Sequence, residues 1–152
     1  MKLLQQTLEQ FTDRLEERGI SIQNLLPEQS VKSAMVDPDR LRQVCVNLLE
    51  NVARYVNDSG ILTVRSFCDP GSLTLILEDS GQGVPDEALS NLFDRFYRTD
   101  LSRNRETGGN GLGLAICKNL IEAHGGSIHA ESVEPHGLRI VITIKTVADT
   151  KQ

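Results

Sequence analysis

The sequence has no long apolar run, no basic cluster and no C-x-x-C pair, and each absence excludes a class of protein. No stretch approaches the roughly 18 apolar residues that a bilayer span needs. The N-terminal MKLLQQTLEQ lacks the apolar core and cleavage site of a signal peptide. The 21 acids outnumber the 16 bases, for a net charge of −5 and a pI near 5.2, which argues against electrostatic binding to nucleic acid. We expect a soluble protein that binds phosphate, if at all, only locally.

Cysteine is scarce, and Cys45, Cys68 and Cys117 each lie beside apolar residues. This pattern favours buried, reduced thiols in a cytosolic protein. The remaining composition is that of one ordinary globular domain, with 152 residues, 39% of them apolar and 24% charged. We therefore expect a single domain over residues 1–152, without an internal repeat.

Hydrophobic periodicity predicts three helices, over residues 4–18, 38–57 and 112–123. The second begins at Asp37-Pro38, a capping carboxylate before a proline at the first helical position. Alternating apolar residues predict strands over 20–23, 33–36, 61–67, 72–79, 128–132 and 138–144. With the helices on one face, these elements predict a two-layer α/β sandwich on a mixed sheet of five to six strands.

The region from Gly81 to Gly126 holds eight of the twelve glycines. Within it, residues 85–109 carry charges, two Phe and a Tyr but little periodicity beyond one short helix. A segment of this length in a compact domain is usually a functional lid or is disordered.

The second predicted helix carries a first group of candidate site residues, Asn47, Asn51, Arg54 and Tyr55. At about 100° per residue they share one flank of the apolar stripe, so two amides, a guanidinium and a phenol face the same volume. The alternative is that a helix bordering solvent carries polar residues at its edge without any function.

A second candidate is Asp79-Ser80-Gly81-Gln82-Gly83, where an apolar strand ends. The strand fixes the carboxylate, and Gly81 and Gly83 permit a tight turn and the close approach of a flat ligand. A buried carboxylate there can accept a hydrogen bond from the exocyclic amine of adenine. The alternative is a common D-x-G turn.

A third candidate is Gly108-Gly109-Asn110-Gly111-Leu112-Gly113-Leu114, which runs into the third helix. Backbone N–H groups at a helix N-terminus stabilise an anion such as di- or triphosphate. The run is neither a Walker P-loop nor a dinucleotide fingerprint, and the alternative is a flexible hinge.

In their order and content these motifs resemble the catalytic and ATP-binding domain of bacterial sensor histidine kinases, in the superfamily that also holds gyrase, Hsp90 and MutL ATPases. Asn47–Asn51 resembles that family's N box, Asp79–Gly83 its G1 box, Phe93–Phe96 its F box and Gly109–Leu114 its G2 box. The resemblance covers about residues 4–144. The run from Phe96 to Asn104 is similar to envelope-stress sensor kinases of the BaeS type.

The resemblance implies a Bergerat-type fold with a mobile ATP lid over 85–109, and a role for each site residue. Asn51 is expected to ligate Mg²⁺ through its side-chain oxygen, Asn47 to lie beside the phosphates or a metal-bound water, and Arg54, where relatives commonly have lysine, to neutralise a phosphate. These three are the candidate catalytic residues. Asp79 is expected to receive the adenine amine, and Tyr55 to pack on the nucleotide. The other implied nucleotide contacts are Gly81, Gly83, Tyr97, Arg98, Gly109, Gly111, Leu112, Gly113 and Leu114, with Phe93 and Phe96 anchoring the lid.

Two positions depart from the family pattern. Val52 replaces the usual small alanine, and the late G-T-x-F element is Gly137-Leu138-Arg139-Ile140. The first is expected only to shift helix packing, whereas the second removes a hydroxyl that some relatives direct at the lid or phosphate.

Asn47 indicates which reaction to expect. Relatives that hydrolyse ATP have a glutamate there as general base, and an amide cannot take a proton at neutral pH. The resemblance therefore implies transfer of the γ-phosphoryl group to a histidine on a separate dimerisation and acceptor domain, for relay to a response regulator. His124, His129 and His136 do not begin the family's phosphoacceptor sequence.

We therefore expect a monomeric catalytic fragment from the cytoplasmic part of an inner-membrane sensor, with ATP and Mg²⁺ as cofactors. Two alternatives remain: a module that binds ATP to order its lid and dock a partner without chemistry, and an autonomous ATPase, which Asn47 disfavours.

Overall fold

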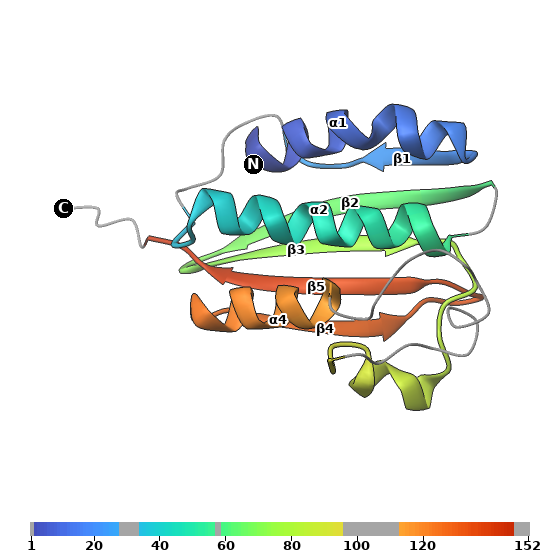
Figure 1. The fold of residues 1–152 in the computed structure, drawn as a ribbon. Coiled ribbons are helices and arrows are strands. Elements are labelled where there is room, and N and C mark those ends of the chain that lie inside the picture. The colour runs from blue at the N-terminus through green and yellow to red at the C-terminus, as the bar shows by residue number, and fades with distance from the viewer. Residues whose placement is uncertain (1, 28–33, 57–58, 96–112, 148–152) are drawn as a thin grey trace.

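A computed structural model describes residues 2–27, 34–56, 59–95 and 113–147. In these residues three α-helices cover one face of a five-stranded sheet (Figure 1), which confirms the predicted two-layer α/β sandwich. The helices are α1 (Lys2–Glu17), α2 (Pro38–Tyr55) and α4 (Gly113–Ala123), and a short 3-10 helix, η1 (Asp86–Asn91), follows the third strand. The strands are β1 (Ile20–Asn24), β2 (Gly60–Asp69), β3 (Ser72–Asp79), β4 (Ser127–Ser132) and β5 (Leu138–Lys145).

The sheet is mixed, with the strand order β1-β2-β3-β5-β4. β1 pairs with β2 in parallel, and every other neighbouring pair is antiparallel. Parallel neighbours require a crossover, and α2 supplies it between β1 and β2. The crossover brings the C-terminal end of α2 to the end of the sheet where β2 begins and β3 ends (Figure 1).

The core lies between the helices and the covered face of the sheet. The apolar periodicity that predicts each element also marks its buried side, because a helix or strand can bury only one face here. Each α-helix and each strand contributes to one continuous buried cluster. Its fully buried members include Leu4, Leu15, Ile20, Val44, Leu49, Leu62, Val64, Leu75, Cys117, Ile121, Ile142 and Ile144.

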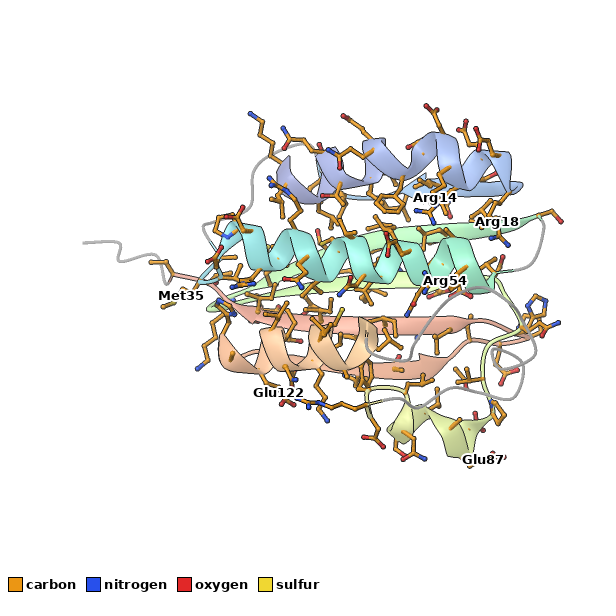
Figure 2. The ribbon with its side chains drawn as sticks, viewed as in Figure 1. Arg14, Arg18, Met35, Arg54, Glu87 and Glu122 are labelled. Carbon is orange, nitrogen blue, oxygen red and sulfur yellow. The ribbon has the colours of Figure 1, made fainter. Side chains whose placement is uncertain are left out.

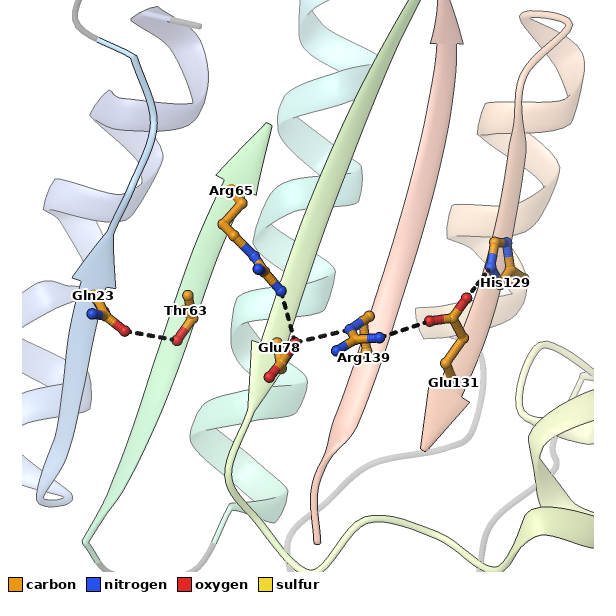
Figure 3. Close-up of polar contacts among 7 residues, drawn as sticks. All are labelled: Gln23, Thr63, Arg65, Glu78, His129, Glu131 and Arg139. Atoms are coloured by element: carbon orange, nitrogen blue, oxygen red, sulfur yellow. Dashed lines mark hydrogen bonds and ion pairs between the residues drawn. The ribbon is translucent and has the colours of Figure 1, made fainter. Parts of the chain in front are cut away.

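The opposite face of the sheet carries a ladder of charged side chains across four strands (Figure 3). Glu78 Oε2 accepts hydrogen bonds from Arg65 at 3.1 Å and from Arg139 at 2.8 Å. Arg139 also donates to Glu131 at 3.1 Å, and Glu131 in turn contacts His129 at 2.9 Å. These groups are partly exposed, so each pair adds at most about 1 kcal/mol to stability. Glu78, the centre of this ladder, directly precedes Asp79 at the end of β3.

Two details of the sequence prediction are wrong. The strand expected over 33–36 is, within the described residues, only an isolated bridge between Ala34 and Thr146, because the chain turns at once into the Asp37-Pro38 helix start. Cys68 is exposed, whereas Cys45 and Cys117 are buried as expected. Cys68 lies at the hairpin end of β2, where three successive residues, 67–69, have left the cover of the core.

The remaining boundaries agree closely with prediction. α2 ends at Tyr55, slightly before the expected residue 57, because Val56 takes an extended conformation. None of the described helices is both long and apolar enough to cross a bilayer.

The start of α2 gives a first testable prediction. Asp37 Oδ1 accepts a hydrogen bond from the Asp39 N–H at 2.9 Å, and it thereby satisfies one of the free donors at the helix N-terminus. Asp37→Ala is expected to lower the free energy of unfolding by about 1 kcal/mol, measured by urea denaturation. Asp37→Asn keeps an acceptor and is expected to lose less than half as much; equal losses in the two variants would contradict the capping role.

Candidate functional site

The candidate polar residues of α2 follow its buried face toward its C-terminal end. Asn47, Asn51 and Arg54 are each partly buried, as expected of side chains at the edge of the apolar stripe. Asn47 Nδ2 donates to the Gly113 carbonyl at 3.5 Å, a contact that joins α2 to the first residue of α4. Figure 2 shows Arg54 near the C-terminal end of α2, at the same end of the molecule as Glu87 of η1. The helix therefore places Asn47 next to the start of α4 and Arg54 near its own C-terminal end.

The turn after β3 is held by its own hydrogen bonds. Ser80 is tied to Ile61 of β2, because its N–H donates to the Ile61 carbonyl at 3.0 Å and its Oγ accepts from the Ile61 N–H at 2.8 Å. The Gly81 N–H donates to Asp79 Oδ1 at 2.9 Å. A Cβ at Gly81 would lie 3.4 Å from Val56. This turn therefore packs against the residue that ends α2.

Two further glycines bring the β4–β5 connection onto the same turn. Gly83 has φ +72°, and a Cβ there would lie 2.7 Å from the Gly137 carbonyl oxygen. Gly137 has φ +137°, and a Cβ there would collide with the Asp79 carbonyl oxygen. No other residue type fits this conformation and this spacing without a backbone shift. The backbone of Gly137 therefore packs directly against the backbone of Asp79.

Asp79 has the electrostatics of a buried strand-end carboxylate. Burial raises its pKa above the ordinary aspartate value, and the neighbouring Glu78 charge adds to the rise. The backbone N–H groups of Gly81 and Leu138 oppose the shift by donating to the carboxylate. A partly buried carboxylate held by backbone donors is well suited to accept a hydrogen bond from a neutral amine.

The glycine-rich run leads into α4, which begins at Gly113. Gly113 and Leu114 are partly buried at this helix N-terminus, where the helix dipole favours an anion. The expected contacts at Gly109, Gly111 and Leu112 lie outside the described residues.

The predicted lid begins as a short ordered segment beside β4. η1 is the short helix expected within 85–109, and Phe93 just beyond it is buried in the core, which fits ordinary core packing as well as a lid anchor. The Ser132 hydroxyl donates to Asp86 Oδ1 at 2.7 Å and ties η1 to β4. Phe96, Tyr97 and Arg98 lie outside the described residues, and the remaining part of the expected lid lies there as well.

Two contacts bring elements with predicted site residues together. Asn47 meets Gly113, and the turn containing Asp79 and Gly81 meets the end of α2, of which Tyr55 is the last residue. Sequence reasoning missed His136, whose Nδ1 lies 2.9 Å from the Gly81 carbonyl oxygen. It also missed that Gly137 packs against the backbone of Asp79. A glycine at position 137 is a signal of close backbone packing, but its partner, like that of His136, cannot be predicted from local spacing.

A five-stranded sheet with helices on one face, a strand-end carboxylate and an amide-bearing helix are the features expected of an α/β nucleotide-binding domain. Residues 36–148 match the family described as "Histidine kinase-, DNA gyrase B-, and HSP90-like ATPase". This match covers most of the chain, so the chain belongs to that ATPase family.

Relatives within the family are sensor kinases. The chain is 41% identical over 142 residues to the signal transduction histidine-protein kinase BaeS of Escherichia coli (strain K12), covering 93% of this chain and 30% of BaeS. Its fold matches the mycobacterial sensor histidine kinase MprB with a TM-score of 0.81 and 27% identity, over 97% of this chain and 95% of that one. It also matches full-length ShkA in complex with AMPPNP, with a TM-score of 0.80 and 28% identity, over 97% of this chain and 30% of ShkA.

Proposed function

We propose that this chain is the ATP-binding phosphodonor domain of a sensor histidine kinase, and that it transfers the γ-phosphoryl group of ATP to a histidine on a dimerisation and acceptor domain. The chain spans about 30% of the length of BaeS. The activity of a whole sensor kinase is therefore a proposal for this chain, which goes beyond its membership of the family. In the proposed whole protein, the chain lies on the cytoplasmic side of an inner-membrane sensor and supplies phosphate for a response regulator.

One observation carries the proposal: the turn that holds Asp79 packs against the end of the helix that bears Asn47, Asn51 and Arg54. A purine whose amine reaches Asp79 would then extend its phosphates along the α2 flank toward the N-terminus of α4. In this arrangement Arg54 neutralises phosphate charge and Tyr55 packs on the nucleotide. The same reasoning proposes Gly81, Gly83, Tyr97, Arg98, Gly109, Gly111, Leu112, Gly113 and Leu114 as further contacts, within a lid over 85–109.

The residues present are compatible with Mg²⁺. The described residues contain no cluster of three or more His, Cys, Asp or Glu side chains that could hold a metal by themselves. Mg²⁺ commonly takes one or two protein oxygens together with substrate phosphates and waters, so the Asn51 amide oxygen is a sufficient protein ligand. The ion would supply charge neutralisation on the phosphate oxygens.

Asn47 supports transfer over hydrolysis. It already donates from Nδ2 to the Gly113 carbonyl, and its amide oxygen is a poor proton acceptor, so it cannot activate water as a carboxylate would. The attacking group is then proposed to come from the acceptor domain, with stabilisation of the transferring phosphoryl group as the main catalytic contribution.

The experiment mixes this chain with Mg-ATP and a separately produced dimerisation and acceptor domain from the same kinase. We expect acid-labile phosphohistidine on the acceptor and slow release of free phosphate. Asn51→Ala is expected to reduce the transfer rate about 100-fold or more, as loss of a transition-state contact does, while ATP binding without Mg²⁺ stays within about twofold of that of the unsubstituted chain. Tight ATP binding without transfer would favour a nucleotide-sensing docking module, and multiple turnover by the chain alone would favour an autonomous ATPase.

A further inference from the structure

The connection between β4 and β5, residues 133–137, contacts the turn that follows Asp79. His136 Nδ1 lies 2.9 Å from the Gly81 carbonyl oxygen, and Gly137 packs against both Gly83 and the backbone of Asp79. The Val133 N–H donates to the Gly137 carbonyl at 3.2 Å and closes the connection on itself. Segments more than fifty residues apart therefore meet at one turn.

The His136 contact constrains the chemistry of its ring. A carbonyl oxygen can only accept a hydrogen bond, so His136 Nδ1 must carry the proton. A neutral ring protonated only at Nε2 would bring two acceptors face to face at 2.9 Å. The contact thus selects the Nδ1–H tautomer and gives an exposed side chain one defined orientation.

Gly81 is held from both sides. Its N–H donates to Asp79 Oδ1 at 2.9 Å, and its carbonyl oxygen accepts a hydrogen bond from His136 Nδ1–H. Because glycine has no side chain to restrict its backbone, these two hydrogen bonds determine how the Gly81 peptide groups are oriented. The first of them, together with the Leu138 N–H, orients the Asp79 carboxylate.

We propose that His136 is a positioning residue of the nucleotide site: by donating from Nδ1 to the Gly81 carbonyl, it fixes the turn so that the Asp79 carboxylate points at the 6-amino group of a purine. The inference rests on the proposed function, because it assumes that Asp79 receives that amine. It predicts that His136 acts on recognition of the base and leaves phosphate binding alone.

The test compares ADP with IDP, in which an oxo group replaces the 6-amino group, by isothermal titration. His136→Ala is expected to weaken ADP binding about three- to tenfold, the range of one hydrogen bond, and to leave IDP binding within about twofold. His136→Asn keeps an N–H donor at the place of Nδ1 and is expected to restore ADP binding to within about twofold, whereas His136→Gln, with its donor at the place of Nε2, is expected to behave like His136→Ala. Unchanged ADP binding in His136→Ala, equal losses for ADP and IDP, or equal behaviour of the Asn and Gln variants would overturn the proposal.

Two further measurements separate the possible failures. In the unsubstituted protein, ¹⁵N spectra of neutral His136 are expected to show the proton on Nδ1, and a proton on Nε2 would overturn the proposal without any variant. Asp79→Asn reports on the proposed function itself. If Asp79→Asn keeps the full preference for ADP over IDP, the adenine assignment of Asp79 fails; if it loses that preference and His136→Ala does not, only the role of His136 fails.

Discussion

Asp79→Asn is expected to weaken ADP binding about 10- to 100-fold while leaving the fold intact. A hydrogen bond to a charged acceptor contributes about 1.5–3 kcal/mol, which corresponds to this range, and the new amide can turn a donor toward the adenine amine. Isothermal titration measures the loss. The matched control is Asp69→Asn at the hairpin end of β2, an exposed carboxylate, for which ADP affinity is expected to change less than twofold.

The raised pKa of Asp79 adds a pH dependence with a defined sign. Amine recognition requires the ionised carboxylate, so ADP affinity is expected to fall as the pH falls through the raised pKa, at higher pH than an ordinary aspartate with its value of 3.8 would give. In the nucleotide-free protein, a raised pKa contributes stability that is complete below the unfolded pKa and lost as pH rises through the folded pKa. Asp79→Asn is therefore expected to abolish the pH dependence of binding in this window and to leave the free protein at least as stable at pH 7. Weaker binding together with loss of cooperative unfolding would contradict this assignment.

Gly137→Ala is expected to lower the free energy of unfolding by about 2–4 kcal/mol. Its φ of +137° is strained for any residue with a side chain, at a cost of about 1–3 kcal/mol. The new methyl group would also meet the Asp79 carbonyl and would lie 3.3 Å from Val133 Cβ. The Asp79 carbonyl belongs to the backbone of β3, which is paired with β5. The two strands would therefore have to move apart at Asp79 to make room for the methyl group. Urea denaturation measures the loss.

Gly71→Ala is the matched control for this prediction. Gly71 also has a positive φ, +84°, but no described atom outside its immediate chain neighbours lies within 4 Å of the place that a Cβ would take, so it carries the conformational cost without the collision. We expect a loss of about 1–2 kcal/mol there and no change in ADP affinity, whereas Gly137→Ala is expected to weaken ADP binding as well. Equal losses of stability in the two variants would show that the contact with Asp79 has no energetic role.

Most of the fold could be predicted because each element has a local pattern of its own. The spacing of Leu4, Leu8 and Leu15 predicts a helix with one buried side, and the alternation of Leu73, Leu75 and Leu77 predicts a half-buried strand; both are confirmed. The two wrong details concern strand pairing and side-chain exposure, which depend on distant segments and cannot be predicted from a local pattern. Whether residues 33–36 pair over one residue or several depends on a partner beyond β5, and the exposure of Cys68 depends on how far the helices reach over β2.

The sequence by itself determined the periodicities of the elements, the start of α2 at Asp37 and the residue types of the site, since these depend on neighbours within a few positions. The tertiary structure alone decided that the Gly81 turn packs on Val56, that Gly137 backs onto Asp79 and that His136 holds Gly81. Those contacts join segments far apart in the sequence, and the two made by residues 136 and 137 depend on β5 lying between β3 and β4. A strand order of that kind is set by the packing of the whole sheet and its helices, which no local pattern encodes.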